Sequence, residues 1–96
     1  MKPVEKIETT IEDTLKERGG NYGAFEDHAL LCQEMKHTVQ QHPNWDLLDA
    51  DMKESLEMIM HKMARIINGN PTYVDSWTDI SGYATLVEKR LNGTKL

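Results

Sequence analysis

Two basic side chains three residues apart are the strongest chemical signal in this sequence. Lys62 and Arg65 lie in a stretch with helical spacing, where residues three apart sit on neighbouring turns and can reach one anion. Arginine offers a planar fork and lysine a point charge, and both suit phosphate. His61 precedes them, with Glu57 four residues before it at a pairing distance. We expect a phosphate-binding surface at His61, Lys62 and Arg65. The alternative is a solvated face, or pairing with carboxylates of a neighbouring helix.

Two pairs of carboxylates suggest a metal. Glu54 and Glu57 are three apart, and Asp75 and Asp79 are four apart, so each pair lies one helical turn apart. Two facing helices that each offer two carboxylates can hold Mg²⁺, which prefers oxygen ligands and leaves positions for a substrate phosphate. The alternative is structural. Asp51 and Glu54 have the spacing of a capping box, and Asp75 suits the first turn of a helix.

A glycine-rich run at residues 19–23 precedes the second predicted helix. Its backbone amides can meet an anion near a helix N-terminus, which makes Asn21 and Tyr22 candidate ligand contacts. The run lacks the GK[ST] ending of a P-loop, and a tight turn with Tyr22 packed inward is the alternative. Tyr83 is the best candidate for stacking on a nucleobase, because it shares a helix flank with Asp79.

Glycine, asparagine and proline divide the chain into four segments in which apolar residues recur every three or four positions. Gly19 suits the C-cap of the first helix. No stretch alternates apolar and polar residues as a half-buried strand does. The sequence therefore predicts an all-α, single-domain, four-helix arrangement, with helices at about 4–18, 24–41, 51–68 and 74–91.

The last two predicted helices are joined by a short turn, so we expect them to be antiparallel neighbours. Their apolar seams are expected to form the centre of the domain; they comprise Met52, Leu56, Ile59, Met63 and Ile66, and Trp77, Ile80, Ala84, Val87 and Leu91. Gly82 lies off the second seam. A mid-helix glycine costs about 1 kcal/mol relative to alanine, so we expect another helix or a ligand to approach closely there.

Size and charge limit the partners. With 96 residues and a net charge of −5, the chain is too acidic for duplex DNA or RNA to be an expected partner, and too short to be comfortably stable alone. A homo-oligomer is therefore expected.

No apolar run approaches the roughly 20 residues of a membrane helix, so no membrane partner is expected. The single cysteine, Cys32, favours a core thiol and a cytoplasmic location.

Several motifs together resemble an uncharacterised family of small proteins from tailed phages and prophages. They are the run at 18–23 followed by Phe25 and His28, the HKxARI segment at 61–66, and the DSWxDIxGYAxLV segment at 75–87. The resemblance covers about residues 15–91. It implies a phage origin and the cytoplasm of a bacterial host, and it implies no settled activity.

A second resemblance, to phage nucleotide-modification-associated proteins and through them to MazG-like all-α nucleoside triphosphate pyrophosphohydrolases, implies a Mg²⁺ site. It would use Glu54 and Glu57 with Asp75 and Asp79, although the second pair is spaced at four rather than three. The residues favour the binding of a nucleotide-type phosphate ligand, and the first resemblance implies a phage accessory protein that uses such binding to sequester a host immune nucleotide signal. The alternatives are a Mg²⁺-dependent hydrolase of nucleotide phosphoanhydrides and an inhibitor that blocks a host factor through an exposed helix face.

Overall fold

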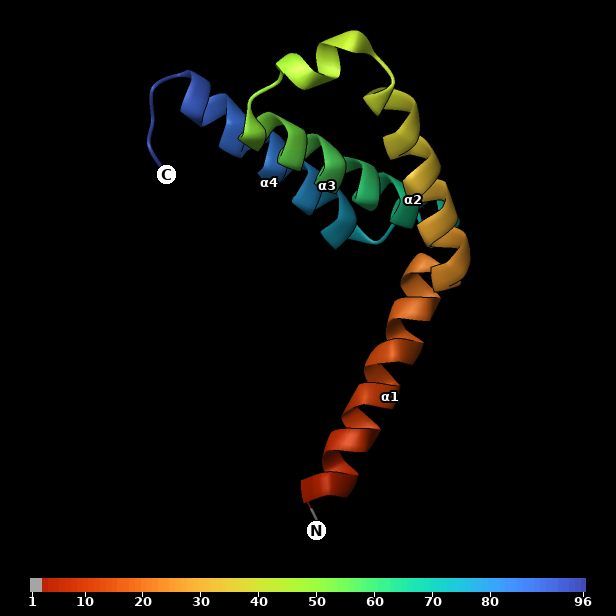
Figure 1. Ribbon diagram of the computed structural model, residues 1–96. Helices are drawn as coiled ribbons and strands as arrows, with labels where there is room; N and C mark the ends of the chain where they lie inside the picture. Colours follow the sequence, from red (N-terminus) through yellow and green to blue (C-terminus); the bar gives the residue numbers. More distant parts are fainter. Residues whose placement is uncertain (1–2) are drawn as a thin grey trace.

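The computed structural model describes the backbone of residues 3–96 and the side chains of residues 10–96. The helices are α1 (Pro3–Tyr22), α2 (Phe25–Gln40), the 3-10 helix η1 (Pro43–Leu47), α3 (Ala50–Asn68) and α4 (Val74–Leu91) (Figure 1). This described part contains no strand. The predicted all-α fold with four helices is confirmed.

Five of the eight predicted helix ends differ from the structure, four of them by one residue and the end of the first helix by four. The first helix does not stop at Gly19 but continues to Tyr22. Its end is set by Gly23, which adopts φ +78° and donates its backbone N–H to the carbonyl oxygen of Gly19 at 2.9 Å. Helix α3 begins at Ala50, one residue before the predicted start, and its N-cap Asp49 makes no side-chain capping bond. Helix α3 therefore does not begin at the capping box predicted at Asp51, and the Asp51 carboxylate binds Arg90.

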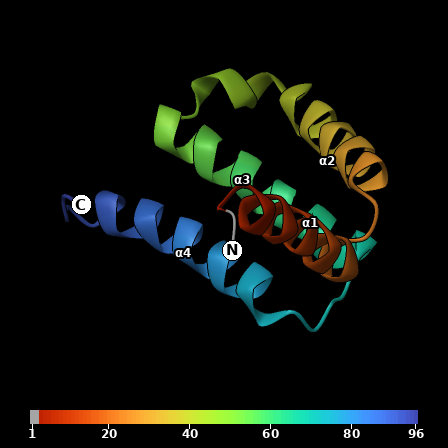
Figure 2. The ribbon, with the colours of Figure 1, turned by 90° about the horizontal axis from the view of Figure 1, so that it is seen from below.

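Helices α2, α3 and α4 form a single layer with α3 in the middle. The C-terminal end of α1 meets this layer, and the rest of α1 projects away from it (Figures 1 and 2). The principal extents of 53 × 31 × 25 Å reflect this projection of α1. Within the described residues no helix is both long and apolar enough to cross a membrane.

Ion pairs fix α3 and α4 as antiparallel neighbours. At one end of the pair Arg90 binds both Asp49, at 3.0 Å, and Asp51, with Nε 2.5 Å from Oδ2. The hydrogen bond from Arg90 lowers the pKa of Asp51 below its ordinary value. Toward the other end Lys62 Nζ lies 2.9 Å from Asp79 Oδ2. The start of α3 thus meets the end of α4, as the short connection predicts.

The junction of α1 and α2 is docked onto the α3–α4 turn. Asn68 Nδ2 donates to the backbone oxygens of Tyr22 at 2.9 Å and Ala24 at 3.1 Å, and the backbone N–H of Asn70 donates to the Asn21 oxygen at 2.6 Å. A Cβ on Gly23 would lie only 2.2 Å from the Asn68 oxygen. Glycine is required there for its left-handed backbone and for the close approach.

The core is thin. The buried apolar residues are Cys32, Met60 and Ala64, and no large side chain in the described part is fully enclosed. The seams predicted to form the centre instead remain partly open to solvent, with Leu56 42 %, Trp77 55 % and Leu91 59 % exposed. The three helices lie side by side rather than around a common axis (Figure 2). Neighbouring helices therefore cover the seams from the flanks only.

Candidate functional site

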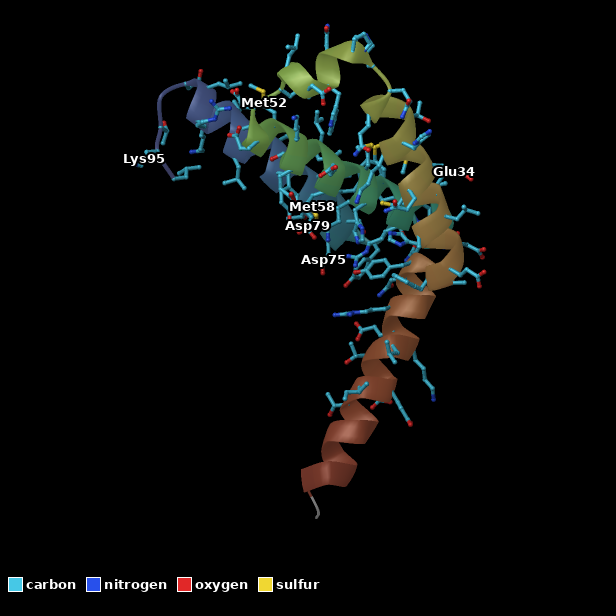
Figure 3. All side chains as sticks on the ribbon, in the orientation of Figure 1. Glu34, Met52, Met58, Asp75, Asp79 and Lys95 are labelled. Atoms are coloured by element: carbon cyan, nitrogen blue, oxygen red, sulfur yellow. The ribbon has the colours of Figure 1, made fainter. Side chains whose placement is uncertain are left out.

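The Lys62–Asp79 ion pair joins the two helices that carry the predicted site. The Lys62 side chain is 11 % exposed and that of Asp79 is 47 % exposed. Met58, Asp75 and Asp79 all lie on the side of the α3–α4 pair from which α1 descends (Figure 3). Lys62 thus has the carboxylate partner that the sequence left as an alternative to phosphate, and an incoming anion would have to share or displace Asp79.

Arg65 lies one turn further along α3 and is held differently. Its Cζ lies 4.2 Å from the centre of the Tyr22 ring, a cation–π contact. Tyr22 meets Tyr73 edge to face with ring centres 5.9 Å apart, and the Tyr73 hydroxyl donates to Asp75 at 3.0 Å. That hydrogen bond raises the pKa of Tyr73. The guanidinium of Arg65 makes no side-chain hydrogen bond or ion pair within the described residues, so its donors are free for a ligand.

The glycine-rich run does not form the expected anion loop. Gly19 and Gly20 lie within α1, so their amides belong to the helix, and Gly23 closes it. Asn21 contributes its backbone oxygen to the docking of the α3–α4 turn. Tyr22 packs inward against Arg65 and Tyr73, which was the alternative for this segment.

A shallow hollow of about 770 Å³ lies on α4 beside the Lys62–Asp79 pair. Asp79, Gly82 and Tyr83 line it together with Lys89, and hydroxyl groups of Thr78, Ser81 and Thr85 add polar contacts. Its volume falls in the range of small-molecule sites, about 300–1,000 Å³. The structure therefore pairs Lys62 with Asp79, and Asp79 and Tyr83 line the hollow, whereas Arg65 and Tyr22 lie at the junction with α1. No part of the described chain lies within 4 Å of a Cβ on Gly82, so no helix of the chain makes the expected close approach there.

His61 belongs to a cluster that the sequence did not reveal. The centres of the His61 and His28 rings lie 4.6 Å apart in an edge-to-face arrangement. The Nδ1 atom of His61 lies 3.8 Å from the Cys32 sulfur. The Nε2–H of His28 donates to the backbone oxygen of His61 at 3.2 Å. Burial, with Arg65 and His28 adding repulsion, lowers the pKa of His61 to about 4. The imidazole is neutral at physiological pH and packs between helices, and the only advance signal was that His28 and Cys32 are four apart.

The four predicted metal ligands lie apart. Glu54 is exposed, Glu57 accepts a hydrogen bond from Gln40 at 2.9 Å, Asp75 accepts one from Tyr73, and Asp79 pairs with Lys62. Among the residues that the structure describes, no three histidine, cysteine or acidic side chains are grouped as a metal site requires. Mg²⁺ held by several carboxylates of one chain does not fit this arrangement.

Comparison of the chain with protein-family models, with curated proteins and with solved structures finds no match. The functional argument therefore rests on the geometry just described.

Proposed function

We propose that this protein binds a phosphate-bearing ligand of the nucleotide type, with Arg65 as the principal anion contact. The observation that carries the proposal is that Arg65 is partly buried, is oriented by Tyr22, and keeps its donors uncommitted within the described part of the chain. A cation fixed in place by an aromatic ring loses little entropy on binding a phosphate, and its planar fork matches two phosphate oxygens.

Lys62 supports the same site in a secondary role. It lies on the turn next to Arg65 and adds positive charge, but its ion pair with Asp79 offsets part of that attraction. The hollow on α4 offers Tyr83 and hydroxyl groups to the rest of a ligand. Sequestration of a nucleotide signal is the biological role that this chemistry suits, since binding alone accomplishes it.

The test is calorimetric titration of nucleoside triphosphates, cyclic nucleotides and inorganic phosphate into the wild-type protein and variants. We expect Arg65→Gln to weaken binding by about tenfold or more, because one charge-assisted hydrogen bond contributes roughly 1.5–3 kcal/mol. Lys53→Gln removes a charge elsewhere on α3 and serves as the matched control. Equal affinities for wild type and Arg65→Gln would disprove the proposal.

The same titration separates binding from hydrolysis. Recovery of intact ligand after incubation with Mg²⁺ supports a binder. Release of pyrophosphate that Asp79→Asn abolishes would instead establish the hydrolase, and would place its metal between chains rather than within one.

A further inference from the structure

The side of α3 opposite Arg65 carries a continuous apolar stripe formed by Met52, Leu56, Ile59 and Met63. Two open grooves flank it. The α2–α3 groove, of about 460 Å³, ends at Val39, and the α3–α4 groove, of about 360 Å³, ends at Leu91. We call this stripe with its two grooves the apolar face. Glu34 is the single charged residue among the described residues that line it.

Among the described residues, no α-helix forms a second layer over the apolar face. Stable domains bury the apolar side of one layer of secondary structure against another layer. Here α2 and α4 flank α3 in one layer, and α1 departs from the end of that layer (Figure 2). As a result Leu56, Met63 and Val39 remain 38–42 % exposed, although their spacing is that of core positions.

The chain exposes more surface than a compact domain of its mass does. A monomer of 11.0 kDa exposes about 5,600 Å² when compactly folded. This chain exposes 7158 Å², an excess of about 1,500 Å² over that compact reference. Its radius of gyration, 16.8 Å, also exceeds the roughly 12.5 Å expected for its length. The projecting α1 accounts for part of both excesses, because it sets the longest extent of the molecule, 53 Å (Figure 1).

We propose that a second copy of this chain covers the apolar face, so that the two α2–α3–α4 layers pack against each other about a two-fold axis. A two-fold axis places the same surface against itself, and a surface that is nearly free of charge meets its copy with little electrostatic repulsion. The apolar face carries Glu34 as the single charged side chain among its described lining residues, whereas the α4 hollow carries Asp79 and Lys89. Leu56 and Arg65 are nine residues apart and so point about 180° apart around α3. The interface therefore leaves the proposed ligand contact open, and the two proposals can fail separately.

Sedimentation equilibrium tests the interface. We expect the wild type to have twice the 11.0 kDa chain mass, and Leu56→Glu to have the mass of one chain at the same concentration. Leu30→Glu is the matched control, because Leu30 is 61 % exposed on α2 but does not line the apolar face, and it should stay dimeric.

Cysteine cross-linking tests the same face without adding charge. Single cysteines at the four stripe positions are oxidised in the otherwise native chain, in which Cys32 is only 3 % exposed. We expect a disulfide-linked dimer from at least one stripe position and none from Leu30→Cys or from the wild type. A wild type that is monomeric at every concentration, or a dimer that persists in folded Leu56→Glu and never cross-links through the stripe, would overturn the proposal.

Discussion

At the scale of single residues, the Lys62–Asp79 pair links α3 to α4 beside the proposed binding site. Lys62 is nearly buried and has one carboxylate partner, while Asp79 is half exposed. Removing the partner of a buried charge costs more than replacing the charge itself by an apolar side chain of similar shape. The two partners are therefore asymmetric in their contribution to stability: removing Asp79 should cost more than replacing Lys62 by an apolar side chain.

This asymmetry predicts a difference between two variants. Asp79→Ala should lower the free energy of unfolding by about 1–2 kcal/mol, less than the loss of a fully buried pair because Asp79 is solvated. Lys62→Met should cost less, since the methionine keeps the packing. Urea unfolding of both variants and of the double variant measures the coupling. Equal losses in the two single variants would show that the charge of Lys62 is fully solvated.

The buried cluster around His61 predicts a dependence of stability on pH. The pKa of His61 falls from 6.5 to about 4 on folding, mainly through burial, so the folded state favours the neutral ring. The unfolded chain takes up a proton as pH falls below 6.5, whereas the folded chain does so only near pH 4. Stability is therefore lost across this window, by roughly 1–2 kcal/mol once solvent screening is allowed for.

Urea unfolding at pH 7 and pH 4.5 measures this loss in the wild type and in His61→Gln. The variant should lose less stability between the two pH values, because it carries no titrating ring at that position. Asp51, whose pKa Arg90 lowers, adds a loss at still lower pH that both proteins share. An identical pH dependence in the two proteins would show that His61 is not responsible.

At the scale of the elements, the end of α1 shows where sequence spacing is informative and where it is not. Helices α2, α3 and α4 lie within one residue of their predicted bounds, because their apolar repeats and flanking turn residues act locally. The end of α1 depends on docking between residues 21–24 and 68–70, which are far apart in sequence. The sequence pattern favoured Gly19 as the end of the helix, whereas of the three glycines in this run only Gly23 meets Asn68.

Two glycine substitutions test this account of the junction. Gly23→Ala should destabilise the protein by about 2 kcal/mol or more, because alanine at φ +78° is strained and its Cβ would strike the Asn68 oxygen. Gly20→Ala lies within α1 with open space around its Cβ, and should stabilise it by up to about 1 kcal/mol. Thermal unfolding followed by circular dichroism compares them. A stable Gly23→Ala protein would contradict the docked geometry.

The candidate site was less predictable than the helices. Spacing along α3 and α4 placed Lys62 opposite the carboxylates of α4 and Tyr83 on one flank with Asp79; the structure pairs Lys62 with Asp79, and Asp79 and Tyr83 line one hollow. Spacing could not show that Arg65 would stack on Tyr22 or that His61 would meet His28, since each contact depends on how the elements before α3 fold back on it.

At the scale of the whole molecule, the predicted helix seams and the observed exposure lead to one conclusion. The seams of α3 and α4 have core spacing, yet Leu56 and Leu91 remain widely exposed because the chain supplies only one layer of helices. The apolar spacing predicts which positions pack in a core, and it does not indicate whether the covering surface belongs to the same chain.

If a second copy supplies that surface, stability must depend on protein concentration. For a dimer that unfolds to two separate chains, a hundredfold rise in concentration favours the folded state by about 2.7 kcal/mol per dimer, which raises the melting temperature of a domain this small by several degrees. Scanning calorimetry at about 2 and 200 µM measures this shift. Leu56→Glu should melt at a lower temperature that does not change with concentration, while Leu30→Glu should behave as the wild type does. A wild-type melting temperature that is constant across this range would mean that one chain is stable with its apolar face in water.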